Sequence, residues 1–118
     1  MNIYSGVPDQ AMTPEVSITE DQAVELAEMF RLMGDASRLK IIVACLDKTV
    51  CVGDIAARLK LSPSLVSHHL RLLRAARVLR AERQGKQVFY ATADEHIRCV
   101  IADMTAHVGE PAELSEQL

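Results

Sequence analysis

The chain has 118 residues, 49% of them apolar and 3% aromatic, which suits one domain with an aliphatic core and excludes a disordered chain. No apolar run approaches the roughly 18 residues of a membrane span, and the N-terminus does not resemble a secretory signal. We therefore expect a soluble cytoplasmic protein with no membrane partner. The net charge of −3 argues against a nucleic-acid binder unless basic residues are concentrated in one segment.

The first elements in chain order are a loose arm and two helices. Residues 1–18 contain proline and glycine without periodicity, so we expect an N-terminal arm. Thr19 is placed to cap a helix that Gly34 ends, and Asp35 is placed to cap a second helix. Helical spacing predicts an apolar stripe on each helix. The first stripe consists of Val24, Ala27, Phe30, Leu32 and Met33, and the second consists of Leu39, Ile42, Val43 and Leu46.

The central segment predicts two further helices, a hairpin and a last helix. A short helix spans about 52–59, and the next begins with Ser62 as its cap and Pro63 in its first turn. VLRAER and QVFYATA read as strands joined by a tight turn at Gln84-Gly85. The last helix runs from about Asp94 to Gly109, before Pro111. These limits predict one domain over residues 19–110 and a C-terminal tail over residues 111–118.

A short helix, a turn, a polar-faced helix and a basic hairpin form a helix-turn-helix followed by a wing, a mainly α fold. Residues 58–90 contain eight basic residues and one acidic residue, a local basic surface on an acidic chain. The alternative is an ordinary solvated helix face. The residues expected to contact double-stranded DNA are Ser62, Ser64, Ser67, His68, His69, Arg71, Arg74, Arg83, Gln84 and Lys86.

Three segments carry a resemblance to the ArsR/SmtB metal-sensing repressors: MGDASRLKIIVACL, CVGDIAARLKLSPSLVSHHLRLLRAARVL and ERQGKQVFYATADEH. The resemblance covers roughly residues 20–110. It implies a winged-helix homodimer, joined through its first and last helices, that binds operator DNA without metal and releases it when metal binds. It also implies that His107 hydrogen-bonds towards the recognition helix near His68.

The last helix holds two pairs of metal-ligand residue types. His96 and His107 are 11 residues apart, so they share a helix face, but about 16 Å of helix separates the Asp94/His96 pair from the His107/Glu110 pair. Two antiparallel copies of the helix would unite the pairs in two equal four-ligand sites. Such sites suit zinc, with cobalt or nickel as alternatives. The spacing D-x-H-x10-H-x2-E also matches the last-helix zinc site of the family that the chain resembles.

Three other interpretations remain. Asp94 is also a helix cap, and the histidines could be ordinary surface residues of a DNA-binding protein that needs no metal. Cys51 could belong to a thiol site, although the family's second cysteine is Gly53 here and residues 1–44 contain neither cysteine nor histidine. A redox or sulfur sensor would use Cys45, Cys51 or Cys99. We expect neither an enzyme nor a small-molecule substrate, because there is no Gly-rich phosphate loop.

Overall fold

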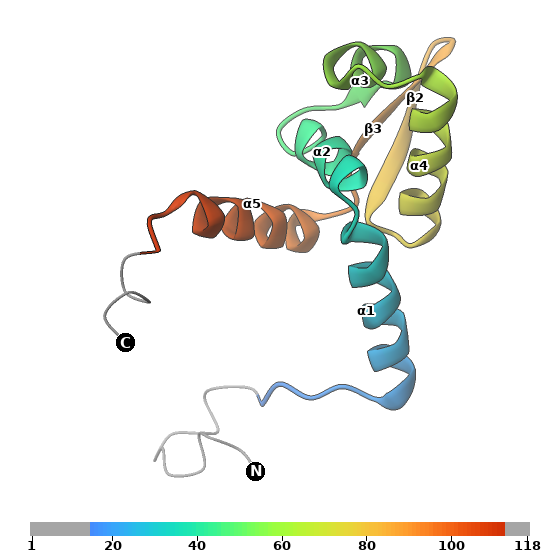
Figure 1. The fold of residues 1–118 in the computed structure, drawn as a ribbon. Helices are drawn as coiled ribbons and strands as arrows, with labels where there is room; N and C mark the ends of the chain where they lie inside the picture. Colours follow the sequence, from blue (N-terminus) through green and yellow to red (C-terminus); the bar gives the residue numbers. More distant parts are fainter. Residues whose placement is uncertain (1–14, 113–118) are drawn as a thin grey trace.

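Five helices and a small sheet make up the part of the chain that the computed structural model describes, residues 15–112 (Figure 1). The predicted arm (1–18) and tail (111–118) lie largely outside this range. In chain order, the elements are α1 (Glu20–Met33), α2 (Ala36–Ala44), β1 (Val50–Cys51), α3 (Val52–Leu59), α4 (Pro63–Ala75), β2 (Leu79–Gln84), β3 (Gln87–Thr92) and α5 (Glu95–Gly109).

The predicted helix starts are confirmed, because each is set by a side chain that lies at the start itself. The Thr19 hydroxyl accepts a hydrogen bond from the backbone N–H of Gln22 at 3.1 Å, and the Gln22 side chain accepts one in return from the Thr19 N–H at 2.9 Å. Asp35 caps α2 through the N–H of Arg38. Ser62 caps α4, whose first residue is Pro63.

The sheet has three antiparallel strands in the order β1-β3-β2, one more than the predicted hairpin. Gln84 pairs with Gln87, so the two turn residues are Gly85 and Lys86, one position later than expected. Gly85 has a φ of +65°, a conformation that glycine adopts without the steric cost of a side chain. The short strand β1 pairs Val50 with Tyr90 and ties the base of the wing to the core.

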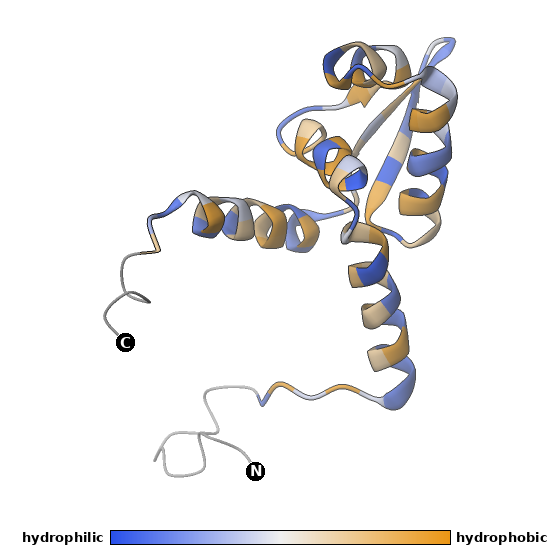
Figure 2. Ribbon diagram, in the orientation of Figure 1, coloured by the Kyte–Doolittle hydropathy of each residue, from blue (hydrophilic) through white to orange (hydrophobic). Residues whose placement is uncertain are grey.

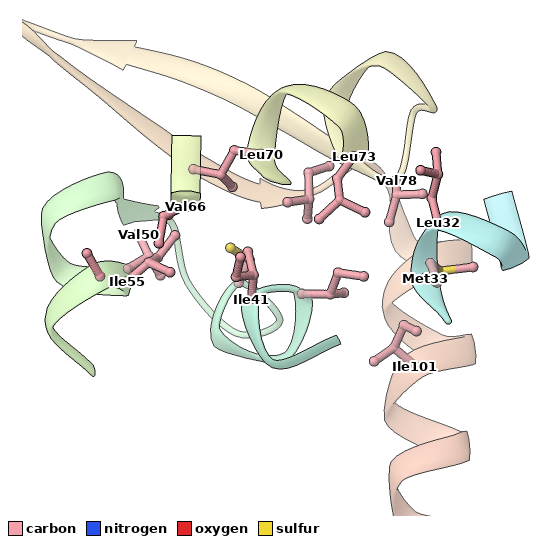
Figure 3. Close-up of a cluster of buried hydrophobic side chains, with 14 residues drawn as sticks. Leu32, Met33, Ile41, Val50, Ile55, Val66, Leu70, Leu73, Val78 and Ile101 are labelled. Carbon is pink, nitrogen blue, oxygen red and sulfur yellow. The ribbon is translucent and has the colours of Figure 1, made fainter. Parts of the chain in front are cut away.

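The hydrophobic core lies between α2, α3, α4 and the sheet, with Leu32, Met33 and Ile101 at its edge (Figure 3). The predicted stripe on α2 is partly wrong. Leu39 and Val43 are 38% and 44% exposed, whereas Ile41 and Ile42 are both fully buried. Neighbouring residues point about 100° apart on a helix, so burial of both shows that α2 is covered over a wide arc rather than along one stripe.

The helices α1 and α5 extend away from this body (Figure 1), and hydrophobic residues recur along both of them (Figure 2). Phe30 is 56% exposed, Met104 57% and Val108 78%. Together with Met33, Leu39 and Val100 they line a groove of about 390 Å³ between α1, α2 and α5. Within residues 15–112, no helix has the length and apolar content to cross a membrane.

Candidate nucleic-acid interface and metal ligands

Helices α3 and α4 form the helix-turn-helix. Lys60, the C-cap of α3, has a left-handed backbone with a φ of +57°, which turns the chain sharply before Ser62 starts α4. Val66, Leu70 and Leu73 of α4 are fully buried in the core. The opposite side of α4 carries side chains able to donate hydrogen bonds. Among them, Ser67 is half-buried, and the exposed ones are Ser64, His68, Arg71 and Arg74.

His69 does not lie where the sequence analysis placed it. Its side chain is only 8% exposed, and its Nδ1 atom is buried without a hydrogen-bond partner among the described residues. Burial lowers the pKa of His69, the nearby Arg38 lowers it further, and Asp35 opposes both. Position 69 is three residues after Val66 and four before Leu73, so helical spacing could have assigned it to the core. The burial of His69 therefore argues against the predicted contact with DNA.

The wing presents basic side chains around its turn. Arg83, Gln84 and Lys86 are exposed, as expected. The Glu82 carboxylate accepts hydrogen bonds from Arg80 at 3.0 Å and from the Gln84 amide at 3.3 Å. These contacts hold the Gln84 side chain along its own strand. In the described part of the chain, Arg83 and Lys86 form no ion pair, so their charges are available to phosphates.

The four predicted metal ligands lie at opposite ends of α5. Asp94 is the N-cap of α5 and its Oδ1 accepts a hydrogen bond from the N–H of Ile97 at 3.0 Å, while His96, His107 and Glu110 are exposed. Nowhere in residues 15–112 do three or more His, Cys, Asp or Glu side chains approach closely enough to hold a metal ion. One chain therefore does not bring the two pairs together.

The two ends of α5 have different surroundings. At its start, Asp94 and His96 line a cavity of about 630 Å³ whose other charged lining residues are Arg74, Arg77 and Arg80. Arg77 also forms an ion pair with Glu25 of α1. At its far end, α5 points away from α4 in Figure 1, and within residues 15–112 no hydrogen bond joins His107 to α4. The contact between His107 and the region of His68 is thus not made within one chain.

The three cysteines are free thiols in different surroundings. Burial raises the pKa of Cys45 to about 12, so this fully buried side chain is a protonated thiol at neutral pH. Cys99 is exposed, and a hydrogen bond with Glu95 raises the pKa of its thiol. Cys51 is half-buried at the end of β1 and makes no side-chain cap for α3. These surroundings disfavour thiolate chemistry at Cys45 and Cys99.

Known proteins share this architecture. Residues 35–81 match the model of the bacterial regulatory protein arsR family. A transcriptional repressor SmtB homolog of Synechocystis sp. is 40% identical over 97 residues, which are 82% of this chain and 73% of that protein. HlyU from Vibrio cholerae is 25% identical with a TM-score of 0.72, covering 78% of this chain and 100% of that one. The NMR structure of the cadmium metal-sensor CMTR from Mycobacterium tuberculosis is 39% identical with a TM-score of 0.58. The match covers 65% of this chain and 80% of that one.

The chain belongs to the arsR family of bacterial regulatory proteins. It is a DNA-binding transcriptional regulator with a winged helix-turn-helix fold, and not an enzyme.

Proposed function

We propose that the chain is a zinc-responsive repressor that binds operator DNA as a homodimer and releases it when zinc binds between two copies of α5. The observation that carries the proposal is the arrangement of α5 itself. This helix presents Asp94 and His96 at one end and His107 and Glu110 at the other, separated by about 16 Å of helix, while the apolar face beside them is uncovered.

The uncovered face supports association of two chains. Phe30, Val100, Met104 and Val108 are all large apolar residues that are 45% or more exposed. A contiguous apolar surface of this kind usually marks an interface. If two copies of α5 pack antiparallel, the Asp94/His96 end of each copy meets the His107/Glu110 end of the other. The same packing thus covers the apolar face and completes two ligand sets.

The donor atoms fit zinc. Two imidazoles and two carboxylates are a nitrogen and oxygen set that zinc accepts in tetrahedral geometry, and cobalt or nickel can take the same ligands. Within residues 15–112, the imidazole side chains of His96 and His107 make no hydrogen bond or ion pair that would have to be broken. Asp94 uses Oδ1 for its cap, so Oδ2 is left for a metal.

The DNA surface consists of the outer side of α4 and the tip of the wing. Ser64, Ser67 and His68 would approach base edges in the major groove, and Arg71 and Arg74 would hold phosphates. Arg83, Gln84 and Lys86 would reach the backbone or minor groove beside it, which leaves Ser62 chiefly as a cap. His69 is not included because it is buried. A regulator that reads DNA in this way would act in the bacterial cytoplasm.

Release of DNA would follow from dimer geometry. The two α4 recognition helices of a dimer can bind DNA at the same time only when their separation matches that of successive major grooves, about 34 Å. Metal binding between the two α5 helices would favour a different relative orientation of the chains. It can shift the equilibrium only by its difference in affinity for the two orientations.

Mixing two variants tests the shared site. His96→Ala and His107→Ala homodimers should each lose zinc binding and zinc-induced release of DNA, while metal-free DNA affinity stays within a few fold. In a heterodimer of the two variants, one site carries both lesions and the other carries none. Purified heterodimers should therefore bind half the zinc of the unmodified protein. Zero zinc binding in these heterodimers would contradict a site shared between chains.

A further inference from the structure

The cavity at the start of α5 is rich in arginine. Its lining includes Asp94 and His96, one half of the proposed metal site, and Arg74, Arg77 and Arg80, so we call it the three-arginine cavity. Its volume of about 630 Å³ lies within the range of clefts that bind ligands, roughly 300–1,000 Å³. Asp94 is the only carboxylate that the described residues contribute to the lining. Positive side chains beside a cation site weaken cation binding, so a metal site here needs negative charge from elsewhere.

The three arginines differ in how far their charges are already paired. Arg77 forms an ion pair with Glu25 of α1, and Arg80 forms one with Glu82 on its own strand at 3.0 Å. Within residues 15–112, Arg74 forms no ion pair, and it is exposed. The last turn of α4 therefore presents an unpaired guanidinium to the cavity.

The remaining lining of the three-arginine cavity is largely apolar. Met29 of α1, Leu79 of β2 and Ile97 of α5 all line it. Leu79 is buried, and the other two are half-buried. A peptide segment that fits this cavity would combine acidic side chains with at least one large apolar side chain.

A segment of this kind follows Glu110. Residues 111–118 read PAELSEQL, with two glutamates, two leucines and no basic residue. Residues 113–118 lie outside the described part of the chain, and their place is inferred from charge and reach. In the proposed dimer, Glu110 of one chain and Asp94 of the other bind the same metal ion. Because Asp94 lines the cavity, Glu113 follows at most about 11 Å further along the chain.

We propose that the C-terminal tail of each chain, residues 111–118, docks in the three-arginine cavity of the other chain of the dimer. This inference rests on the proposed function, which brings the end of one α5 to the start of the other. Glu113 and Glu116 neutralise the arginines, while Leu114 covers the apolar part of the lining. The tail thereby offsets the positive charge beside the metal site. Because Arg74 is also part of the proposed DNA surface, a docked tail and a DNA phosphate compete for it.

A photo-crosslinking side chain in the tail tests the docking directly. A benzophenone amino acid, which is apolar like leucine, replaces Leu114 in the full chain. Isotopically heavy and light chains are mixed and irradiated in excess chelator, and cross-linked peptides are identified by mass spectrometry. Position 114 should form heavy-to-light links to residues 74–81 or 93–97. Links confined to one chain, or links only to other surfaces, would overturn the proposal.

A double-mutant cycle tests whether charge holds the tail in place. Glu113→Gln with Glu116→Gln should lower the yield of these cross-links about fivefold, near the upper end for exposed charge pairs. In an Arg74→Gln background, the same change should lower the yield by no more than about twofold. Arg83→Gln is the matched control background, because Arg83 is an exposed arginine of the wing that does not line the cavity. A full fivefold loss in the Arg74→Gln background would contradict pairing of the tail with Arg74.

Zinc affinity gives a second readout, measured by competition with a coloured chelator. Glu113→Gln with Glu116→Gln should weaken zinc binding about threefold, because the arginines beside Asp94 are no longer neutralised. Glu20→Gln with Asp21→Asn is the matched control, since it removes the same charge from the first turn of α1. Equal weakening by the control would reduce the effect to general charge and contradict neutralisation by a docked tail.

The tail proposal and the proposed function can fail separately. If the unmodified protein binds no zinc, the proposed function fails, and the cross-links formed in chelator still decide whether the tail docks. If zinc binds at a site shared between chains but position 114 forms no link to the cavity of the other chain, only the tail proposal is overturned.

Discussion

Replacing His69 with leucine tests the division between the core face and the DNA face of α4. His69 is 8% exposed and its Nδ1 has no partner among the described residues, so the folded state keeps a polar atom from water without compensation. Such an atom costs about 1–3 kcal/mol. Leucine removes the polar atom but fills the space with a different shape. We therefore expect His69→Leu to stabilise the protein by about 1 kcal/mol at pH 7.5, near the low end of that range.

The same variant should lose a pH dependence. Because the pKa of His69 is lowered in the folded protein, the unfolded chain binds its proton first as the pH falls. Stability from this residue is present above the ordinary histidine pKa of 6.5 and is lost as the pH falls towards the lower folded pKa. One titrating group can change the free energy of unfolding by at most about 1.4 kcal/mol per pH unit. Urea unfolding of His69→Leu between pH 7.5 and 5.5 should show a shallower decline than the unmodified chain.

His68→Leu is the matched control, since the two imidazole rings are neighbours whose centroids lie 5.9 Å apart. His68 is exposed on the DNA side of α4, so its loss should weaken DNA binding and leave stability nearly unchanged. His69→Leu should instead leave DNA affinity within about twofold, a shift of under 0.5 kcal/mol. A large fall in DNA affinity for His69→Leu, with an unchanged unfolding midpoint, would refute the assignment of His69 to the core.

Three further predictions concern the wing, the thiols and the dimer. Arg83→Ala with Lys86→Ala should weaken binding to all sequences and reduce the salt dependence by about one unit per lost phosphate contact; an unchanged slope in a salt titration would remove the wing from the interface. A variant without cysteines, with alanine at the buried position, should keep its zinc response in a DNA-release titration; loss of the response with an intact circular dichroism spectrum would favour a thiol sensor. Met104→Glu with Val108→Glu should give monomers in sedimentation experiments, whereas Val43→Glu, a change at another exposed apolar residue, on α2, should not.

The sequence predicted the helix boundaries well because their signals are local. Thr19, Asp35, Ser62 and Asp94 each cap the helix that they precede, so neighbouring residues contain the needed information. The short strand β1 was missed, because two residues have no period and the strand exists only through pairing with distant Tyr90 and Phe89. Face assignments on α2 failed for a related reason, since three successive apolar residues fit several faces.

The residues of the candidate site were also predictable only where their signals are local in the sequence. Spacing along α5 identified four exposed side chains that one chain keeps apart, and the pairing of two chains remains a prediction. Spacing alone could not identify Arg77, because nothing local marks an arginine as left-handed and its partner Glu25 is 52 residues away. The buried position of His69 was available from the period of α4, but its polar chemistry favoured a DNA contact.

In the proposed dimer, the uncovered apolar surface of α1 and α5 would also make the thermal stability of this protein depend on its concentration. A second chain that buries this surface would stabilise the folded state by mass action, so the melting temperature should rise as the protein is concentrated. A regulator present in few copies would be at low concentration and would gain little stability from association. An operator that holds two chains side by side would then stabilise their fold as well as receive their recognition helices.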